Sequence, residues 1–257
     1  MADRRDYCIR EIATIYTDFP EKFGIPRQSG LIEGLKGRIV FQPEYRTPDA
    51  VRGMEEYSHL WLVWGFSEAK QDTFCATVAP PRLGGRIRKG VFATRSPYRP
   101  NSLGLSSVRL ERVEIEEHLG PVIYVAGVDM LNGPPIYDIK PYLPYVDCHT
   151  QARGSFSDVV KEHVLKVHIS EELLHILPEE QRKTVVELLE QDPRTAFIHD
   201  ETRVWGIAYR RWNIRFTVSG EELNVVEITE LDTEEQADRT STVRNTCPET
   251  GKGYGKA

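Results

Sequence analysis

The sequence has few cysteines, and they lie far apart. Cys8, Cys75, Cys148 and Cys247 form no Cys-x-x-Cys pair and share no metal-binding spacing with the histidines of this 257-residue chain. That scatter argues against a structural zinc site and against a disulfide framework, so we expect reduced thiols and no bound metal.

Long apolar segments are also missing. None approaches the ~20 residues needed to span a membrane. The first residues, Met1 to Asp6, lack the apolar core of a signal peptide. The composition, 40% apolar and 28% charged, is that of an ordinary globular protein, long enough for one large domain or two modest ones. We therefore expect a cytoplasmic protein with no membrane partner.

A third absence concerns nucleotide-binding motifs. The pair Gly84-Gly85 could cradle a phosphate, but no Gly-x-Gly-x-x-Gly string stands between a predicted strand and a predicted helix. A Rossmann-type cofactor site is therefore unsupported by the sequence.

The chain is acidic overall, but many of its basic residues are concentrated in one segment. The net charge is −6, yet the segment from Arg82 to Arg112 holds eight basic residues against Glu111 alone. A basic surface on an acidic protein is typical of RNA contact, and the alternative is a solvated basic loop.

Two prolines stiffen the loop that follows a short apolar segment, Val91–Ala93, which we expect to be a strand. Pro97 and Pro100 fix their own φ angles and remove two backbone donors, so the polar groups of Arg95 and Arg99 should be held in place. Rigid polar loops often carry binding groups. The alternative is a turn whose arginines simply point into water.

This loop is part of a longer string that resembles a known family. Gly90-Val-Phe-Ala-Thr-Arg-Ser-Pro-x-Arg-Pro-Asn-x-x-Gly-Leu-Ser106 is similar to the signature of the TsaA-like (TrmO) family. Phe23–Gly30, Gly53–Trp61 and Asp138–Tyr142 also resemble family blocks, in the family's order, over roughly the first 150 residues. The resemblance implies an S-adenosylmethionine-dependent methyltransferase that acts on N6 of the threonylcarbamoylated adenosine 3′ of the tRNA anticodon.

The fold class follows from strand content and from the resemblance. Residues 1–154 are rich in predicted strands, which favours a barrel or sandwich, and the family's catalytic domain is a β-barrel. We expect a mainly β protein, with a small α+β domain over residues 155–231 and a disordered tail over 232–257. The expected elements are strands at Cys8–Tyr16, Gly37–Phe41, Leu60–Phe66 (buried on both faces), Leu103–Ile115 and Gly120–Val128, a short helix at Pro48–Tyr57, a loop at Lys70–Gly90, helices at Ser155–Val167 and Ser170–Asp192, and an antiparallel sheet over Val204–Ile228 with a hairpin turn at Gly220.

The resemblance also implies which residues contact the methyl donor. They are Pro26, Arg27, Gln28, Ser67, Glu68, Arg95, Leu105, Asn132, Gly133, Pro134 and Pro135. Two places depart from the family. Ser67 replaces a frequent histidine, and Asn132–Pro135 replaces Asp-Gly-Thr-Pro, which removes a carboxylate and a hydroxyl and could weaken donor affinity.

Methyl transfer needs an aligned donor and acceptor more than a strong base. Asp138 could accept the acceptor's proton, or could simply pair with Lys140 or Arg95. Tyr137 and Tyr142 could stack on an unpaired anticodon-loop base, whereas His59 is better read as structural. The basic residues expected to contact RNA are Arg86, Arg88, Lys89, Arg99 and Lys140.

Two other functions remain open on the sequence. The chain could be a non-catalytic RNA- or nucleotide-binding barrel if the Asn132 and Pro134 departures abolish donor binding, or a methyltransferase with a different acceptor. Because family members dimerise around this site, the resemblance also implies a homodimer.

Overall fold

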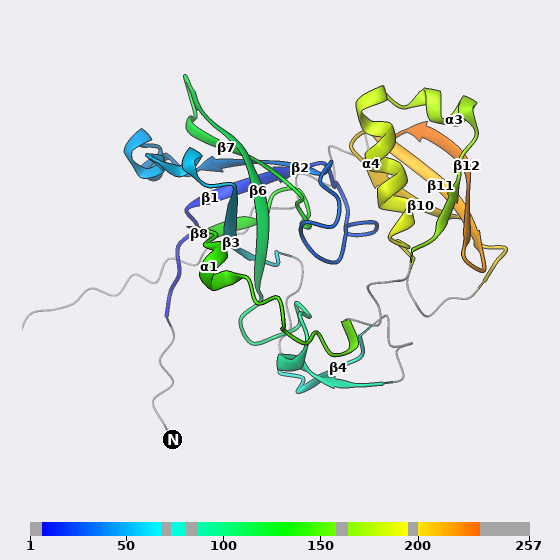
Figure 1. Cartoon of the computed structure of the whole chain (residues 1–257), viewed down its shortest axis with the longest axis horizontal. Helices are drawn as coiled ribbons and strands as arrows, with labels where there is room; N and C mark the ends of the chain where they lie inside the picture. The colour runs from blue at the N-terminus through cyan, green and yellow to red at the C-terminus, as the bar shows by residue number, and fades with distance from the viewer. Residues whose placement is uncertain (1–6, 68–72, 81–86, 158–163, 195–199, 232–257) are drawn as a thin grey trace, which may run out of the picture.

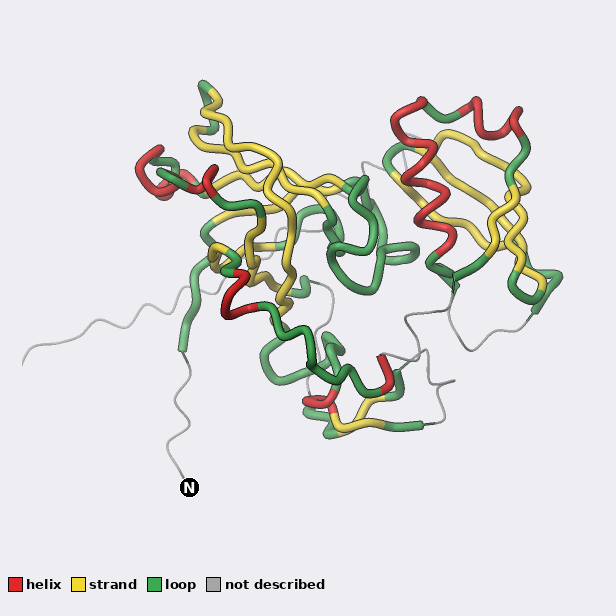
Figure 2. The backbone as a smooth tube through the Cα atoms, viewed as in Figure 1, coloured by secondary structure: helices red, strands yellow, loops and turns green. Residues whose placement is uncertain are grey.

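Six antiparallel strands close into a barrel in the order β1-β2-β7-β6-β3-β8. The computed structural model describes residues 7–67, 73–80, 87–157, 164–194 and 200–231, and Figure 1 and Figure 2 show the barrel beside a second unit built on its own sheet. The barrel strands are β1 (Ala13–Thr17), β2 (Lys36–Phe41), β3 (His59–Gly65), β6 (Leu103–Glu116), β7 (Gly120–Ala126) and β8 (Pro135–Pro141). The prediction of a mainly β protein with a barrel is confirmed.

The barrel closes where β1 pairs with β8, and apolar side chains that alternate along the strands fill its interior. In β3, Leu60, Leu62 and Trp64 point into the core, while Trp61 and Val63 are only half-buried. The expectation that this strand is buried on both faces is therefore wrong. Along this apolar strand, alternate side chains point into the barrel and fill it. The side chains between them lie on the outer face and are only half-buried.

The second unit pairs a four-stranded sheet with two helices. The sheet order is β10-β11-β12-β9, with β9 running parallel to β12. Ser170 caps α3 by accepting a hydrogen bond from the Leu173 amide, as its position before two glutamates predicts. The elements are β9 (Lys166–His168), α3 (Glu171–Ile176), α4 (Glu179–Glu190), β10 (Trp205–Tyr209), β11 (Trp212–Ser219) and β12 (Glu222–Glu230). None of the described helices combines the length and apolar character needed to span a bilayer.

Several local predictions are wrong. Val91–Ala93 is a 3-10 turn rather than a strand, because Phe92 and Ala93 face solvent and the run is too short to pair. The helix expected at Pro48–Tyr57 is two 3-10 turns, η2 (Pro48–Val51) and η3 (Met54–Glu56), since Gly53 adopts a left-handed conformation between them. The remaining short elements are η1 (Pro43–Tyr45), α1 (Pro144–Asp147), and the paired strands β4 (Thr77–Val78) and β5 (Lys89–Gly90) inside the segment expected to be a loop.

Boundaries differ at two further places. The first strand begins at Ala13 rather than near Cys8, and the segment expected to be helical up to Val167 ends in strand β9. Val167 and its neighbours pair with β12, where β-branched side chains suit a sheet better than a helix. Phe156 and Ser157 of that predicted helix are helical, whereas its residues 158–163 and the predicted disordered tail over 232–257 lie outside the described residues.

The loop between β1 and β2 joins the two units. Phe19 packs on Tyr209 with ring centroids 5.9 Å apart, and Phe23 stacks on Trp205 at 5.9 Å with the planes within 8°. Buried residues from both units form one apolar cluster. The loop that carries Pro26 to Gln28 is therefore anchored on the second unit as well as on the barrel.

Candidate functional site

Three neighbouring barrel strands align candidate residues on the outer face of the barrel. Leu105 of β6 and Asp138 of β8 both stand opposite Val63 of β3. Directly opposed residues in antiparallel strands share a face, so these side chains form one row. Leu105 is 57% exposed, which leaves an apolar surface open beside a carboxylate.

Asp138 makes two local contacts. Its Oδ2 lies 2.8 Å from Lys140 Nζ, and its Oδ1 accepts a hydrogen bond from the Ile139 amide at 3.0 Å. The pairing with Lys140, one of the two alternatives for this residue, is therefore present. The Lys140 side chain is 66% exposed and that of Asp138 is 45% exposed, so the ion pair contributes little stability and leaves the carboxylate accessible.

The two candidate tyrosines lie at different ends of strand β3. Tyr142 packs near the start of the strand, with its ring centroid 5.7 Å from that of Trp61 and 6.1 Å from that of His59. Tyr137 lies at the other end, against Gly65, where an added Cβ would come within 2.7 Å of the Tyr137 hydroxyl oxygen. A single base cannot stack on both rings at once, so the two are separate candidate contacts.

Burial raises the pKa of Tyr137, with a smaller contribution from the negative charge of Glu11. The phenol is therefore protonated at neutral pH and can donate a hydrogen bond. A register shift in the pairing of β3 with β8 leaves Tyr137 between the paired residues Ile136 and Asp138. Such bulges often redirect a side chain at a functional edge.

Loops from distant parts of the chain bring Gln28 and Arg95 together. The Arg95 guanidinium donates a hydrogen bond to the Gln28 side-chain oxygen, and the Gln28 amide nitrogen donates to the carbonyl of Arg27. Arg27 points the other way, and its Nη2 donates to the carbonyl of Arg194 at 3.4 Å. Pro26 and Arg27 line a narrow cleft between the units, opposite Leu188 and its neighbours in the second unit.

The turn over Asn132–Pro135 is tied to strand β1. Asn132 Oδ1 accepts a hydrogen bond from the Thr17 amide at 3.0 Å, and the Gly133 amide donates to the Ile15 carbonyl at 2.9 Å. Gly133 has φ = 95°, which only glycine adopts without strain. The Asn132 side chain thus braces the backbone. Pro135 extends the turn to the end of β3, where its ring lies 3.1 Å from the Cβ position of Gly65.

A partly buried aspartate that the sequence did not single out, Asp129, lies next to these loops. Trp64 Nε1 donates to Ser106 Oγ at 3.0 Å, and Ser106 Oγ donates to Asp129 Oδ1 at 2.6 Å. Burial raises the pKa of Asp129 to about 6, although its hydrogen bonds and the charge of Arg95 act in the opposite direction. A carboxylate placed between the apolar residues Val128 and Met130 is the one sequence signal that could have revealed it.

The candidate RNA contacts are dispersed. Arg88 is held by its own hairpin, because its Nε donates to Thr77 Oγ1 at 2.8 Å. The Arg99 guanidinium lies 6.0 Å from the ring centroid of Phe92, and Lys89 follows Arg88 on the same ribbon.

The candidate donor contact Ser67 follows Phe66, whose amide donates to the Ser102 carbonyl. Glu68 and Arg86 lie outside the described residues.

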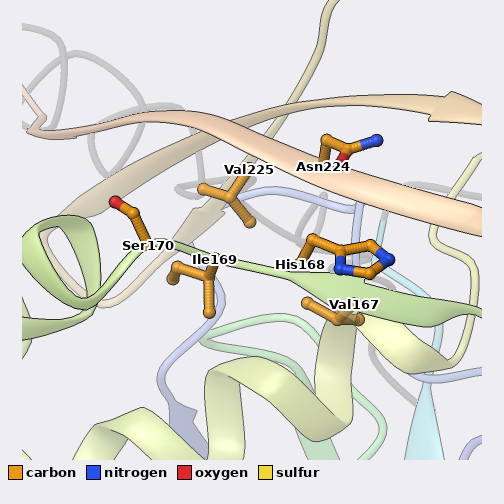
Figure 3. Close-up of a pocket in the computed structure, with 6 residues that line it drawn as sticks. All are labelled: Val167, His168, Ile169, Ser170, Asn224 and Val225. Atoms are coloured by element: carbon orange, nitrogen blue, oxygen red, sulfur yellow. The ribbon is translucent and has the colours of Figure 1, made fainter.

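Another hollow lies far from these loops in sequence. An open depression of about 430 Å³ sits over β9 and β12, and Figure 3 shows His168 as the titratable side chain in its lining. His168 Nε2 is 3.8 Å from Glu222 Oε2. None of the candidate site residues lines this depression. Within the described ranges, no group of three or more histidine, cysteine or acidic side chains is arranged to hold a metal ion.

The anchor between the two units can be tested through its ion pair. Arg210 Nη2 lies 3.1 Å from Asp18 Oδ2, and burial is the largest effect on Asp18, raising its pKa while Arg210 lowers it. Arg210→Met should lower the free energy of unfolding by about 1–3 kcal/mol at pH 7.5, because it leaves a mostly buried carboxylate without its cation. Urea denaturation measures this loss.

The pH dependence of that loss separates charge from packing. In the variant the pKa of Asp18 should rise further, so the folded state binds a proton more readily and the deficit should shrink at pH 4.5. Arg211→Met is the matched control, because Arg211 pairs with Glu230 at an exposed site. An equal deficit for Arg210→Met at both pH values would contradict the ionic explanation.

Two family models match the chain. The model for the tRNA-methyltransferase O N-terminal domain matches residues 14–148, and the model for the TrmO C-terminal domain matches residues 162–231. The first covers the barrel and the second covers the sheet and helices of the second unit.

Individual proteins of known name are also similar. The chain is 36% identical over 218 residues to the tRNA (adenine(37)-N6)-methyltransferase of Escherichia coli (strain K12), covering 81% of this chain and 92% of that protein. It is 38% identical over 216 residues to a Pseudomonas aeruginosa protein provisionally named S-adenosylmethionine-dependent methyltransferase RcsF, covering 81% and 90%. The crystal structure of TrmO from P. aeruginosa superposes with a TM-score of 0.73 at 29% identity, covering 90% of this chain and 100% of that one.

Proposed function

This chain belongs to the tRNA-methyltransferase O family, and from that membership we propose that it transfers a methyl group from S-adenosylmethionine to N6 of adenosine 37 in tRNA. We further propose that this adenosine carries a threonylcarbamoyl group and that the enzyme acts in the cytoplasm. The name of the E. coli relative supports the reaction and the position, and that of the P. aeruginosa relative supports the donor.

The observation that carries the proposal is the contact between Arg95 and Gln28. A guanidinium and a carboxamide meet there from loops 67 residues apart, on a barrel that matches the family. S-adenosylmethionine has a carboxylate that such donors can bind. Leu105 supplies exposed apolar surface of the kind an adenine ring needs, so the residues fit the donor.

The other proposed donor contacts include the turn over Asn132–Pro135. The turn at Asn132–Pro135 is fixed to β1 and offers backbone groups as well as the Asn132 amide nitrogen. We assign the donor site to this turn and to Arg95, Gln28 and Leu105. Pro26, Arg27, Ser67 and Glu68 complete the assignment. Because Asn132 Oδ1 already accepts the Thr17 amide, we expect the turn to act mainly through its backbone.

The bound donor supplies an electrophilic methyl group on a sulfonium. The chain's own residues orient the acceptor and handle its proton. Asp138, exposed on the outer face, can accept the proton that N6 loses after attack, while Lys140 holds the carboxylate at the strand. Tyr142 can stack on an unpaired base of the anticodon loop. Tyr137, protonated at neutral pH, can donate a hydrogen bond near the donor.

Basic residues near the barrel's loops would bind the tRNA backbone. Lys140 lies beside Asp138, and Arg99 lies in the proline-stiffened loop. Phosphate contacts of this kind position an RNA without reading its bases. We assign this role to Arg86, Arg88, Lys89, Arg99 and Lys140. We also propose that the barrel domain spans residues 1–154 and the C-terminal domain residues 155–231.

The surface beside the donor site supports a homodimer. Phe92 is 71% exposed and Phe74 is 62% exposed, and their rings stack at 6.2 Å. Tyr98 and Leu105 add further exposed apolar area from the same part of the chain. We propose that a second copy covers this surface. Light scattering should give twice the mass of one chain, and a monomer at micromolar concentration would contradict the dimer.

The reaction is tested with labelled donor and two tRNA preparations. Purified protein is incubated with methyl-deuterated S-adenosylmethionine and tRNA that either carries or lacks the threonylcarbamoyl group, followed by nucleoside mass spectrometry. The label is expected on threonylcarbamoyladenosine alone. Label on unmodified adenosine would overturn only the requirement for the threonylcarbamoyl group. No label on either tRNA would favour a non-catalytic RNA-binding barrel or another acceptor.

A further inference from the structure

A chain of hydrogen bonds begins inside the barrel at Trp64. The indole is 5% exposed and donates to Ser106 Oγ, and Ser106 is 1% exposed. An indole N–H can only donate, so the Ser106 hydroxyl accepts this bond and must direct its own proton elsewhere. The proton goes to Asp129 Oδ1, 2.6 Å away, a length typical of a hydroxyl bound to a carboxylate.

On its other side, Asp129 faces the donor loops. The backbone N–H of Ser29 and the positive charge of Arg95 both act to lower the pKa of its carboxyl group. The backbones approach closely at this point, because the Gly30 amide donates to the Gly127 carbonyl at 2.9 Å. A Cβ on Gly127 would lie 3.2 Å from the Gly30 backbone, so this approach depends on glycine.

Asp129 therefore connects three segments. Ser106 of strand β6 donates a hydrogen bond to it, while Ser29 of the β1–β2 loop and Arg95 of the proline-stiffened loop influence its pKa. Arg95 in turn donates to Gln28. Withdrawing a carboxylate from water is costly unless it is paired and hydrogen-bonded, and for the partly buried Asp129 the compensating groups belong to the segments that carry the proposed donor contacts.

We propose that Asp129 is a positioning residue for the methyl donor: it holds Arg95 and the Gln28–Ser29 backbone in the arrangement that presents their hydrogen-bond donors to the carboxylate of S-adenosylmethionine. The inference rests on the proposed function and deepens it. Asp129 itself does not touch the donor in this account. It acts through its negative charge, which orients the Arg95 guanidinium and attracts the backbone N–H of Ser29.

The first test is Asp129→Asn, measured by calorimetric binding of S-adenosylmethionine to the full chain. Asparagine keeps the shape and the acceptor for Ser106 but removes the negative charge that faces Arg95. We expect the dissociation constant to rise about 10- to 100-fold at pH 7.5, the range of one charge-assisted hydrogen bond. Asp129→Glu should recover part of the affinity, because it restores the charge.

Thermal denaturation of the ligand-free protein gives a second readout. Because the folded-state pKa of Asp129 lies above its usual value, this group makes the wild type less stable as the pH rises from about 4 to 7. Asp129→Asn should lack that part of the decline, so its melting temperature at pH 7.5 should equal or exceed that of the wild type. A purely structural role predicts instead a lower melting temperature, with donor affinity unchanged in the folded fraction.

Ser106→Ala distinguishes the effect of the Ser106 hydrogen bond on Asp129 from the effects of Arg95 and Ser29. It removes the hydrogen bond that lowers the pKa of Asp129 while leaving Arg95 and Ser29 in place. Donor affinity should then begin to fall at a higher pH than in the wild type as the solution is acidified. If donor affinity falls at the same pH in Ser106→Ala as in the wild type, the result contradicts the proposal.

The outcomes distinguish this inference from the proposed function. If the wild type binds S-adenosylmethionine and Asp129→Asn binds it equally well at pH 7.5, the positioning role is overturned while the function stands. If the wild type binds no S-adenosylmethionine, both are overturned. Weaker binding by a variant that is as stable as the wild type supports the role.

Discussion

Substitution of Arg95 by alanine is expected to lower kcat/KM for S-adenosylmethionine by about 100-fold. A hydrogen bond to a charged group contributes about 1.5–3 kcal/mol, and each 1.4 kcal/mol is about tenfold. The substitution also removes the guanidinium that donates to Gln28 and the positive charge that faces Asp129. The loss should therefore exceed that of a single surface arginine. Initial rates of methyl transfer at varied donor concentration measure it.

Two further variants test whether the loss in Arg95→Ala is specific to this site and to the guanidinium group. Arg52→Ala should leave kcat/KM unchanged, because Arg52 is 78% exposed and pairs with Asp49 within its own turn. Arg95→Lys should recover only part of the activity, since lysine keeps the charge but not the planar donor geometry. Wild-type kinetics in Arg95→Ala would remove Arg95 from the donor site.

Gly104→Ala is expected to cause the largest loss of stability among single substitutions near the site. A Cβ at Gly104 would lie 2.2 Å from Trp64 Cε2 and 2.6 Å from both Cζ2 and Nε1. The indole is rigid and enclosed, so it must leave its position or displace the backbone, and its hydrogen bond to Ser106 would be lost. Overpacking and a broken buried hydrogen bond together should cost about 3 kcal/mol or more.

A shift of about 10 °C in Tm corresponds to that loss for a chain of this size, and thermal denaturation measures it. Gly90→Ala is the matched control. No heavy atom lies within 4 Å of its Cβ position and its φ is −56°, so its stability should stay within about 0.5 kcal/mol of the wild type. A Gly104→Ala variant as stable as the control would contradict the packing of Trp64 inside the barrel.

The architecture was largely predictable because its signals are local or carried by whole motifs. Alternating apolar residues marked β6 and the strands of the second sheet, and Gly220 marked its hairpin turn. The resemblance to the TsaA-like family implied the barrel, which strand content alone could not separate from a sandwich. The Gly90–Ser106 string likewise pointed to Arg95, which the structure brings to Gln28.

What the sequence could not show depends on contacts between distant segments. Burial raises the pKa of Asp129 while Ser106 and Arg95 lower it, and neither of these residues stands near Asp129 in the chain. The separation of Tyr137 from Tyr142 follows from their packing at opposite ends of β3. Val91–Ala93 resembles a strand by composition, but it folds as a 3-10 turn after Val91 donates one backbone hydrogen bond to the Ala76 carbonyl.

We expect this barrel to hold S-adenosylmethionine beside Arg95 and Gln28. The most direct test is isothermal titration calorimetry of the purified wild type with S-adenosylmethionine, repeated with Arg95→Ala and Arg52→Ala. The account predicts saturable binding of one donor per chain, weakened about 100-fold in Arg95→Ala and unchanged in Arg52→Ala. Absence of binding by the folded wild type, or equal binding by all three proteins, would contradict it.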